Sequence, residues 1–248
     1  MKGFGRLTLV NLKLYLREPI STFFTLAFPP LCVVLFGAMY GNEPAPLLGG
    51  HGSMDVSMPG YTAMILGTVG LMGVPITISG YRETGVLRRF QTTPMRPLTY
   101  ILADIVANLV TTLLGMVGLV IVGWLLYRVH FEGHVIEVIL VVIFSGLATY
   151  SIGYLIAGVA PSARAAQVVG MVIFYPMMFL SGASIPIEIL PDSVRRVAGF
   201  LPLTYVVRLL RGLWFGDSWG GHLLETGVLA GVLLVCSALA ARFFRWKS

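Results

Sequence analysis

The chain has 248 residues, of which 56% are hydrophobic and 11% are charged, a composition that excludes an ordinary soluble domain. The net charge of +6 does not indicate a nucleic-acid partner, because the Lys and Arg residues flank the apolar runs, as membrane topology requires. The polar stretches are too short for a separate soluble domain, so residues 1–248 are expected to form a single transmembrane domain.

The N-terminal segment, residues 4–17, has an amphipathic pattern. Leu7, Val10 and Leu14 alternate with basic residues, as in a helix that lies on a membrane surface. We expect this helix to lie along the cytoplasmic surface. A basic flank that only fixes the topology explains the pattern equally well.

Two stretches that are apolar enough to cross a bilayer follow at residues 20–40 and 60–80. A transmembrane helix needs about 20 mostly apolar residues. The first stretch is too long for the core of a signal peptide and starts too far from Met1, so we interpret it as a retained span. The loop between the two spans contains no Lys or Arg, which favours an outer position for it.

A charged segment, YRETGVLRRFQTTPMRP, comes next and predicts a short helix at residues 81–93. An apolar stripe runs along this helix, an acidic residue lies in its first turn and basic residues lie near its end, which matches the helix dipole. A positive-inside loop explains the basic residues but neither the stripe nor the early acidic residue, so we prefer a helix that docks a soluble partner. The predicted contact residues are Glu83, Leu87, Arg88, Arg89 and Phe90.

Three further spans are expected at residues 98–127, 135–160 and 167–185, and a last one at 222–241. The first of these is longer than a bilayer requires, so it should tilt or project into the cytoplasm. The predicted fold class is therefore an all-α membrane protein with six transmembrane helices. Most Lys and Arg residues lie before the first span and after the second and sixth, which predicts a multi-pass protein of the plasma (inner) membrane with both termini in the cytoplasm.

The segment before the last span, residues 187–219, is neither a span nor an ordinary loop. Its apolar residues recur at helical spacing in two short runs, one starting at Asp192 and one after Pro202, where Thr204 can cap the helix. Trp214 and Trp219 are typical of a membrane interface. We expect two short re-entrant or interfacial helices in the outer leaflet.

These features resemble the ABC type 2 transporter permeases. An acidic residue, an Arg-rich helix and then "TPM" after the second span is similar to the coupling helix of that family. The run LSGASIPIEILPDSVRRVAGFLPLTYVVRLLRGLWFG, residues 180–216, is similar to the family's extracellular re-entrant segment. With the six-helix layout, the resemblance covers essentially the whole chain. It is specific to the family and not to a substrate.

The resemblance implies that two such permeases pair, as a homodimer or a heterodimer. Each would contact a separate ATP-binding-cassette ATPase subunit through the helix after the second span, with Glu83 as the acidic contact residue. Residues 4–17 would be the family's elbow helix. The short loop at residues 41–59 separates this chain from relatives with a large extracellular domain at that position.

The sequence lacks the motifs of a catalytic subunit. It contains no G-x-x-x-x-G-K-[ST] phosphate loop, no H-E-x-x-H and no G-x-S-x-G. We therefore expect no enzyme activity, no cofactor and no metal site in this chain. ATP and Mg are expected on the partner ATPase.

The expected function is ATP-driven export of a hydrophobic or amphipathic substrate, first a drug or antibiotic. Export of a lipid-linked glycan or polysaccharide by the same architecture is the alternative. An ion-coupled secondary transporter is a second alternative, because Asp104, Glu137 and Glu225 lie inside spans, although each lies close to a predicted helix end. The candidate substrate path consists of weakly polar and apolar residues of the spans: Thr111, Thr112, Thr149, Tyr150, Phe174, Tyr175 and Met178.

Overall fold

The structure is a computed structural model that describes residues 2–17, 19–86, 97–184, 187 and 190–243. Within these ranges the chain is helical, and the only strand-like feature is one isolated bridge between Pro44 and Gly52. The elements are α1 Lys2–Arg17, α2 Pro19–Thr22, η1 Phe23–Ala27, α3 Phe28–Tyr40, η2 Pro46–Leu48, α4 Ser53–Gly67, η3 Thr68–Gly73, α5 Val74–Glu83, α7 Pro97–Tyr127, α8 Val135–Val159, α9 Ala163–Leu180, α10 Asp192–Ala198, α11 Pro202–Trp214, η5 Trp219–Gly221 and α12 Leu223–Phe243.

Six helices in the described ranges are long and apolar enough to cross a membrane, which confirms the predicted fold class. They are Phe23–Tyr40, Ser53–Glu83, Thr99–Tyr127, Val135–Val159, Ala163–Leu180 and Leu223–Phe243. The second span begins seven residues earlier than the sequence indicated. Its first turns contain Asp55 and two serines, which lower the hydropathy, but they pack against protein and not against lipid.

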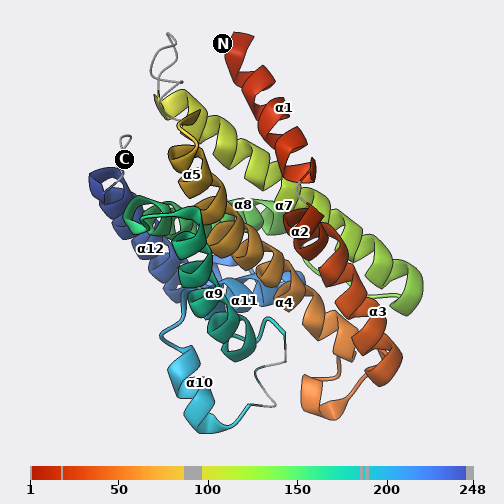
Figure 1. Cartoon of the computed structure of the whole chain (residues 1–248). Coiled ribbons are helices and arrows are strands. Elements are labelled where there is room, and N and C mark those ends of the chain that lie inside the picture. The colour runs from red at the N-terminus through yellow and green to blue at the C-terminus, as the bar shows by residue number, and fades with distance from the viewer. Residues whose placement is uncertain (1, 18, 87–96, 185–186, 188–189, 244–248) are drawn as a thin grey trace.

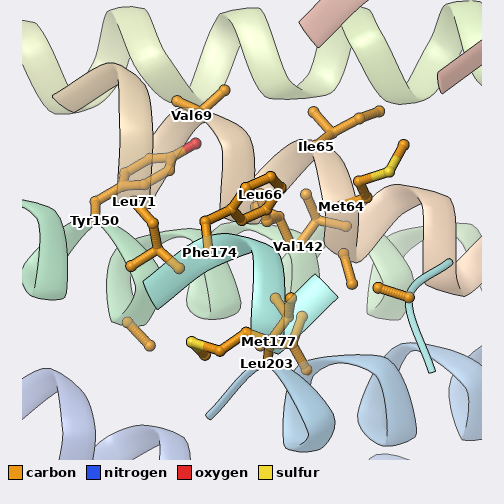
Figure 2. Packing of buried hydrophobic residues seen from close by; sticks show 14 of the residues in the cluster. Met64, Ile65, Leu66, Val69, Leu71, Val142, Tyr150, Phe174, Met177 and Leu203 are labelled. Carbon is orange, nitrogen blue, oxygen red and sulfur yellow. The ribbon is translucent and has the colours of Figure 1, made fainter. Parts of the chain in front are cut away.

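The second span, formed by α4, η3 and α5, is the centre of the bundle. In the most apolar stretch of this span 72% of the residues are buried inside the protein, whereas in the corresponding stretch of the sixth span only 11% are. Figure 2 shows Leu66, Val142, Phe174 and Leu203 meeting where this span packs against α8, α9 and α11. Its middle section, η3, is a π-helix, a form that is often found as a short bulge at functional sites.

α1 begins and α12 ends at the end of the bundle where α5 ends and α7 starts (Figure 1). We call this the inner end, because the sequence predicts it to be cytoplasmic. The opposite end carries α10 and the connection at residues 41–52, and we call it the outer end. This arrangement agrees with an even number of spans.

The predicted N-terminal amphipathic helix is present as α1, which packs along α7. The buried position on it is Asn11, whereas Val10 and Leu14 are exposed. The apolar stripe is therefore divided: Leu7 packs partly against the core, whereas Val10 and Leu14 are largely exposed. Periodicity alone identifies such a stripe, but it does not tell whether the stripe contacts lipid or protein.

The predicted outer segment forms α10 and α11, which meet at an angle of 98°. α11 packs against α4, α8 and α12 through a buried apolar face. Two details of the prediction were wrong. Thr204 lies inside α11 and donates its hydroxyl to the Ala198 carbonyl at 2.7 Å, so it does not cap the helix from the N-cap position, which is Leu201. Trp214 is buried and donates its indole N–H to the His130 carbonyl, so it does not lie at a lipid interface.

Candidate coupling segment and substrate pocket

The predicted coupling segment begins inside the second span. α5 continues to Glu83, and Gly85 then adopts a positive φ of 71°, the backbone conformation that commonly ends a helix. Helical geometry resumes at Val86. Leu87, Arg88, Arg89 and Phe90, the other predicted contact residues, lie outside the described residues.

Glu83 therefore lies in the last turn of α5 and not in the first turn of a separate helix, as the sequence had suggested. The glycine two positions later is the signal that was missed. The Glu83 side chain is exposed at the inner end. A carboxylate in this position is accessible to a soluble partner and is attached directly to the most buried span.

Arg82, next to Glu83, ties the second span to the fourth. Its guanidinium donates to the Ala157 carbonyl at 2.9 Å and to the Ala160 carbonyl, at the end of α8. The last carbonyls of a helix lack partners within the helix, and a cation there also complements the helix dipole. A displacement at Glu83 would thus act on two spans. In the sequence, Arg82 is one of several basic residues after the second span that indicate topology, and nothing there points to these carbonyl partners.

Two of the predicted path residues, Thr111 and Thr149, line neither the apolar pocket nor the polar pocket described below. Both are buried, and their hydroxyls donate within their own helices, to the Ala107 and Ser145 carbonyls at 3.0 and 2.9 Å. This is the usual way in which a helix satisfies a buried threonine. These two residues pack the bundle.

Thr112 and Tyr150 form part of a polar seam between α7 and α8. Their hydroxyl oxygens are 2.6 Å apart, and the Tyr150 hydroxyl also donates to the Asn108 carbonyl at 3.2 Å. Towards the inner end, the Asp104 carboxylate accepts hydrogen bonds from the Tyr154 hydroxyl at 2.6 Å and from the Asn108 amide at 3.1 Å. The seam joins the third and fourth spans across their buried faces.

The last three predicted path residues, Phe174, Tyr175 and Met178, line one apolar pocket of about 50 Å³. Tyr175 is exposed, so the pocket opens to the surface of the bundle. A Cβ atom at Gly67 would lie 2.6 Å from the Phe174 ring, so a glycine is needed for this ring to pack so closely against the second span. The other residues of the pocket come from the first and second spans: Phe24, Phe28, Met64, Thr68 and Met72.

Residues 3–215 match the family model described as ABC-2 type transporter. The chain belongs to the ABC-2 type transporter family.

Several curated relatives resemble this ABC-2 chain. Nodulation protein J of Rhizobium leguminosarum bv. viciae is 34% identical over 95 residues, which are 38% of this chain and 37% of the relative. The inner membrane transport permease YhhJ of Escherichia coli K12 is 25% identical over 190 residues, which are 73% of this chain and 51% of the relative. The chain thus spans about a third to a half of the length of these relatives.

Membership of the ABC-2 family confirms the resemblance stated from the coupling and re-entrant motifs. Membrane subunits of this family are generally non-catalytic transport components, which agrees with a sequence that lacks a phosphate loop. The family match extends over α1, the coupling segment, the apolar pocket and α11. It names no substrate for this chain.

Proposed function

We propose that the chain is the permease subunit of an ATP-driven exporter that works with a second permease and two separate ATPase subunits in the plasma (inner) membrane. The observation that supports this most is the continuous second span. It presents Glu83 at the inner end, is tied there to α8 by Arg82, and forms one wall of the apolar pocket.

ATP-driven closure of the ATPase subunits would act on the segment after Glu83. The force would travel along α5 to Met72 and Thr68, eleven and fifteen residues away, or about 16 to 22 Å along a helix at 1.5 Å per residue. This stretch includes the π-helical section η3, where a small change of helix register can move side chains in the pocket wall. Because Arg82 holds the α8 terminus, the fourth span would follow the second.

The chemistry of the pocket favours a hydrophobic or amphipathic substrate. Phenylalanine, tyrosine and methionine side chains offer large apolar contacts, and methionine adapts to different shapes. A drug-like or antibiotic-like molecule fits this lining. A lipid-linked glycan could place its lipid part there, and the same pocket supports that alternative.

The role of the coupling segment is tested by Glu83→Lys, measured as ATP-dependent transport in vesicles that contain the chain and its ATPase. We expect the variant to insert normally and to lose nucleotide-dependent transport, because the charge at the contact is reversed. Glu43→Lys is the matched control, since Glu43 is an exposed acidic residue at the outer end. A fully active Glu83→Lys variant would remove the coupling role.

A second experiment separates this proposal from ion-coupled transport. Purification of the chain from its native membrane should recover a protein with a phosphate loop, and transport should follow ATP and not the proton gradient. If no such ATPase is recovered and transport follows the proton gradient, the secondary-transporter alternative replaces the proposal.

A further inference from the structure

A second pocket, polar where the first is apolar, lies towards the inner end between α1, α5 and α7. It has a volume of about 30 Å³, room for two or three water-sized groups. Its polar lining comes from all three helices: Asn11 and Tyr15, Thr77 and Tyr81, and Asp104 and Asn108. It shares no lining residue with the apolar pocket.

The carboxylate of Asp104 is the main electrostatic feature of this inner polar pocket. Its side chain belongs to a residue that is only 5% exposed, and none of the ion pairs in the described part of the chain includes it. Both hydrogen bonds that the described residues make to it, from Tyr154 and Asn108, end on Oδ2. Buried charges in proteins are normally paired, and Oδ1, which receives neither of these hydrogen bonds, has the capacity to accept from a cationic donor.

Asn11 supplies a second and independent observation. It comes from α1, is 8% exposed, and its Nδ2 is buried without a hydrogen-bond partner among the described residues. An unpaired buried donor is unfavourable unless an acceptor occupies the space in front of it. Two residues that line the pocket thus have unused hydrogen-bonding capacity, an acceptor on Asp104 and a donor on Asn11.

We propose that this inner polar pocket binds the end of an amino alcohol, with its primary ammonium donating to Asp104 and its neighbouring oxygen accepting from Asn11. A primary ammonium carries three N–H donors and offsets the buried negative charge. A quaternary ammonium has no N–H and cannot make the same bonds. The volume admits the end of the ligand and leaves the rest of it outside.

Two sources share this chemistry, the ethanolamine headgroup of a phospholipid and a soluble amine. Leu14 of α1 also lines the pocket and is exposed, and the sequence places α1 at the inner membrane surface. The pocket entrance would therefore lie at headgroup level.

The test uses the full purified chain and measures lipid retention by native mass spectrometry after equal exposure to phosphatidylethanolamine and phosphatidylcholine. We expect a preference of about tenfold for phosphatidylethanolamine, the size of one charge-assisted hydrogen bond. Asp104→Asn and Asn11→Leu should each remove the preference. Thr111→Val is the matched control on α7, because Thr111 bonds within its own helix and does not line the pocket.

A parallel measurement follows the thermal stability of the wild-type chain in millimolar ethanolamine and in millimolar choline. Stabilisation by ethanolamine alone, without a lipid preference, would identify a soluble amine as the ligand. Equal retention of both lipids together with no response to ethanolamine would overturn the proposal. Should Asp104→Asn fail to fold, an unchanged lipid preference in Asn11→Leu would overturn it as well. Neither readout needs an ATPase, so the result is independent of the proposed transport function.

Discussion

Two aspartates are buried at opposite ends of the bundle to almost the same extent, Asp55 at 4% and Asp104 at 5% exposure, yet their surroundings differ. At the outer end, both oxygens of Asp55 are used. Oδ1 accepts from the Asn42 amide at 3.0 Å and from the His130 backbone N–H at 2.8 Å, and Oδ2 accepts from the Gly52 N–H at 3.3 Å. At the inner end, the donors to Asp104 converge on one oxygen beside a cavity.

The comparison shows that burial alone does not distinguish a structural carboxylate from a ligand-binding one. The donors to Asp55 come from two connections: Asn42 and Gly52 lie at the two ends of the connection between α3 and α4, and His130 lies in the segment after α7. Asp55 therefore holds the outer end together. Asp104, in contrast, has one oxygen that accepts no hydrogen bond from the described residues, and the residue lines a cavity. The two features together point to a ligand.

The largest effect that we expect is on stability and distinguishes these two residues directly. Asp55→Asn must place an amide NH₂ against a backbone N–H, because both oxygens of Asp55 accept from such donors, and it should lower the free energy of unfolding by about 3 kcal/mol. Asp104→Asn can keep its amide oxygen at the Oδ2 position and turn the NH₂ towards the cavity, so a loss of about 1 kcal/mol is expected.

Unfolding of both variants in the same detergent, followed by helical signal against denaturant, measures this difference. Equal losses of unfolding free energy in the two variants would show that the unbonded oxygen of Asp104 does not distinguish it from Asp55. A larger loss for Asp104→Asn would reverse the assignment of the structural and the ligand-binding carboxylate.

A smaller effect on stability, with a larger one on transport, is expected for Arg82. Arg82→Gln shortens the side chain and removes the charge, so the bonds to the Ala157 and Ala160 carbonyls are lost and about 1–2 kcal/mol of stability with them. ATP-dependent transport should fall several-fold more than stability explains, because the second and fourth spans are no longer tied. Arg164→Gln is the control, since Arg164 is an exposed arginine in the first turn of α9, just after the connection that follows α8. Equal transport in the two variants would contradict the coupling role of Arg82.

The architecture was largely predictable because each span satisfies its backbone hydrogen bonds internally and must match the bilayer in length. Where the prediction failed, the physical cause differed from one position to the next. Hydropathy measures preference for lipid, so the start of α4 at Ser53, which is buried against protein, was assigned to a loop. Trp214 was assigned to an interface from its residue type, and Thr204 to a cap from its position after Pro202, although both are buried in protein contacts.

The candidate sites were predictable only in part, because a sequence does not state which helices are neighbours. Phe174, Tyr175 and Met178 follow one helical face and were found together. Their partners Phe24 and Met64 come from other spans and could not be assigned. Arg82 was missed because its carbonyl partners lie more than seventy residues further along the chain.

The smallest effect that we expect concerns Thr112 and Tyr150, which lie between the two ends and pair without any charge. In a double-mutant cycle of Thr112→Val and Tyr150→Phe, the coupling energy should be about 0.5–1.5 kcal/mol, as for other hydrogen bonds between membrane helices. Unfolding in detergent measures all four proteins of the cycle. A coupling near zero would mean that the two hydroxyls find other partners and that the seam does not depend on their 2.6 Å contact. A coupling energy as large as the Asp55→Asn effect would mean that a neutral hydrogen-bonded pair stabilises this bundle as much as a carboxylate whose two oxygens both accept hydrogen bonds. The contrast between Asp55 and Asp104 would then not follow from their charge and hydrogen bonds.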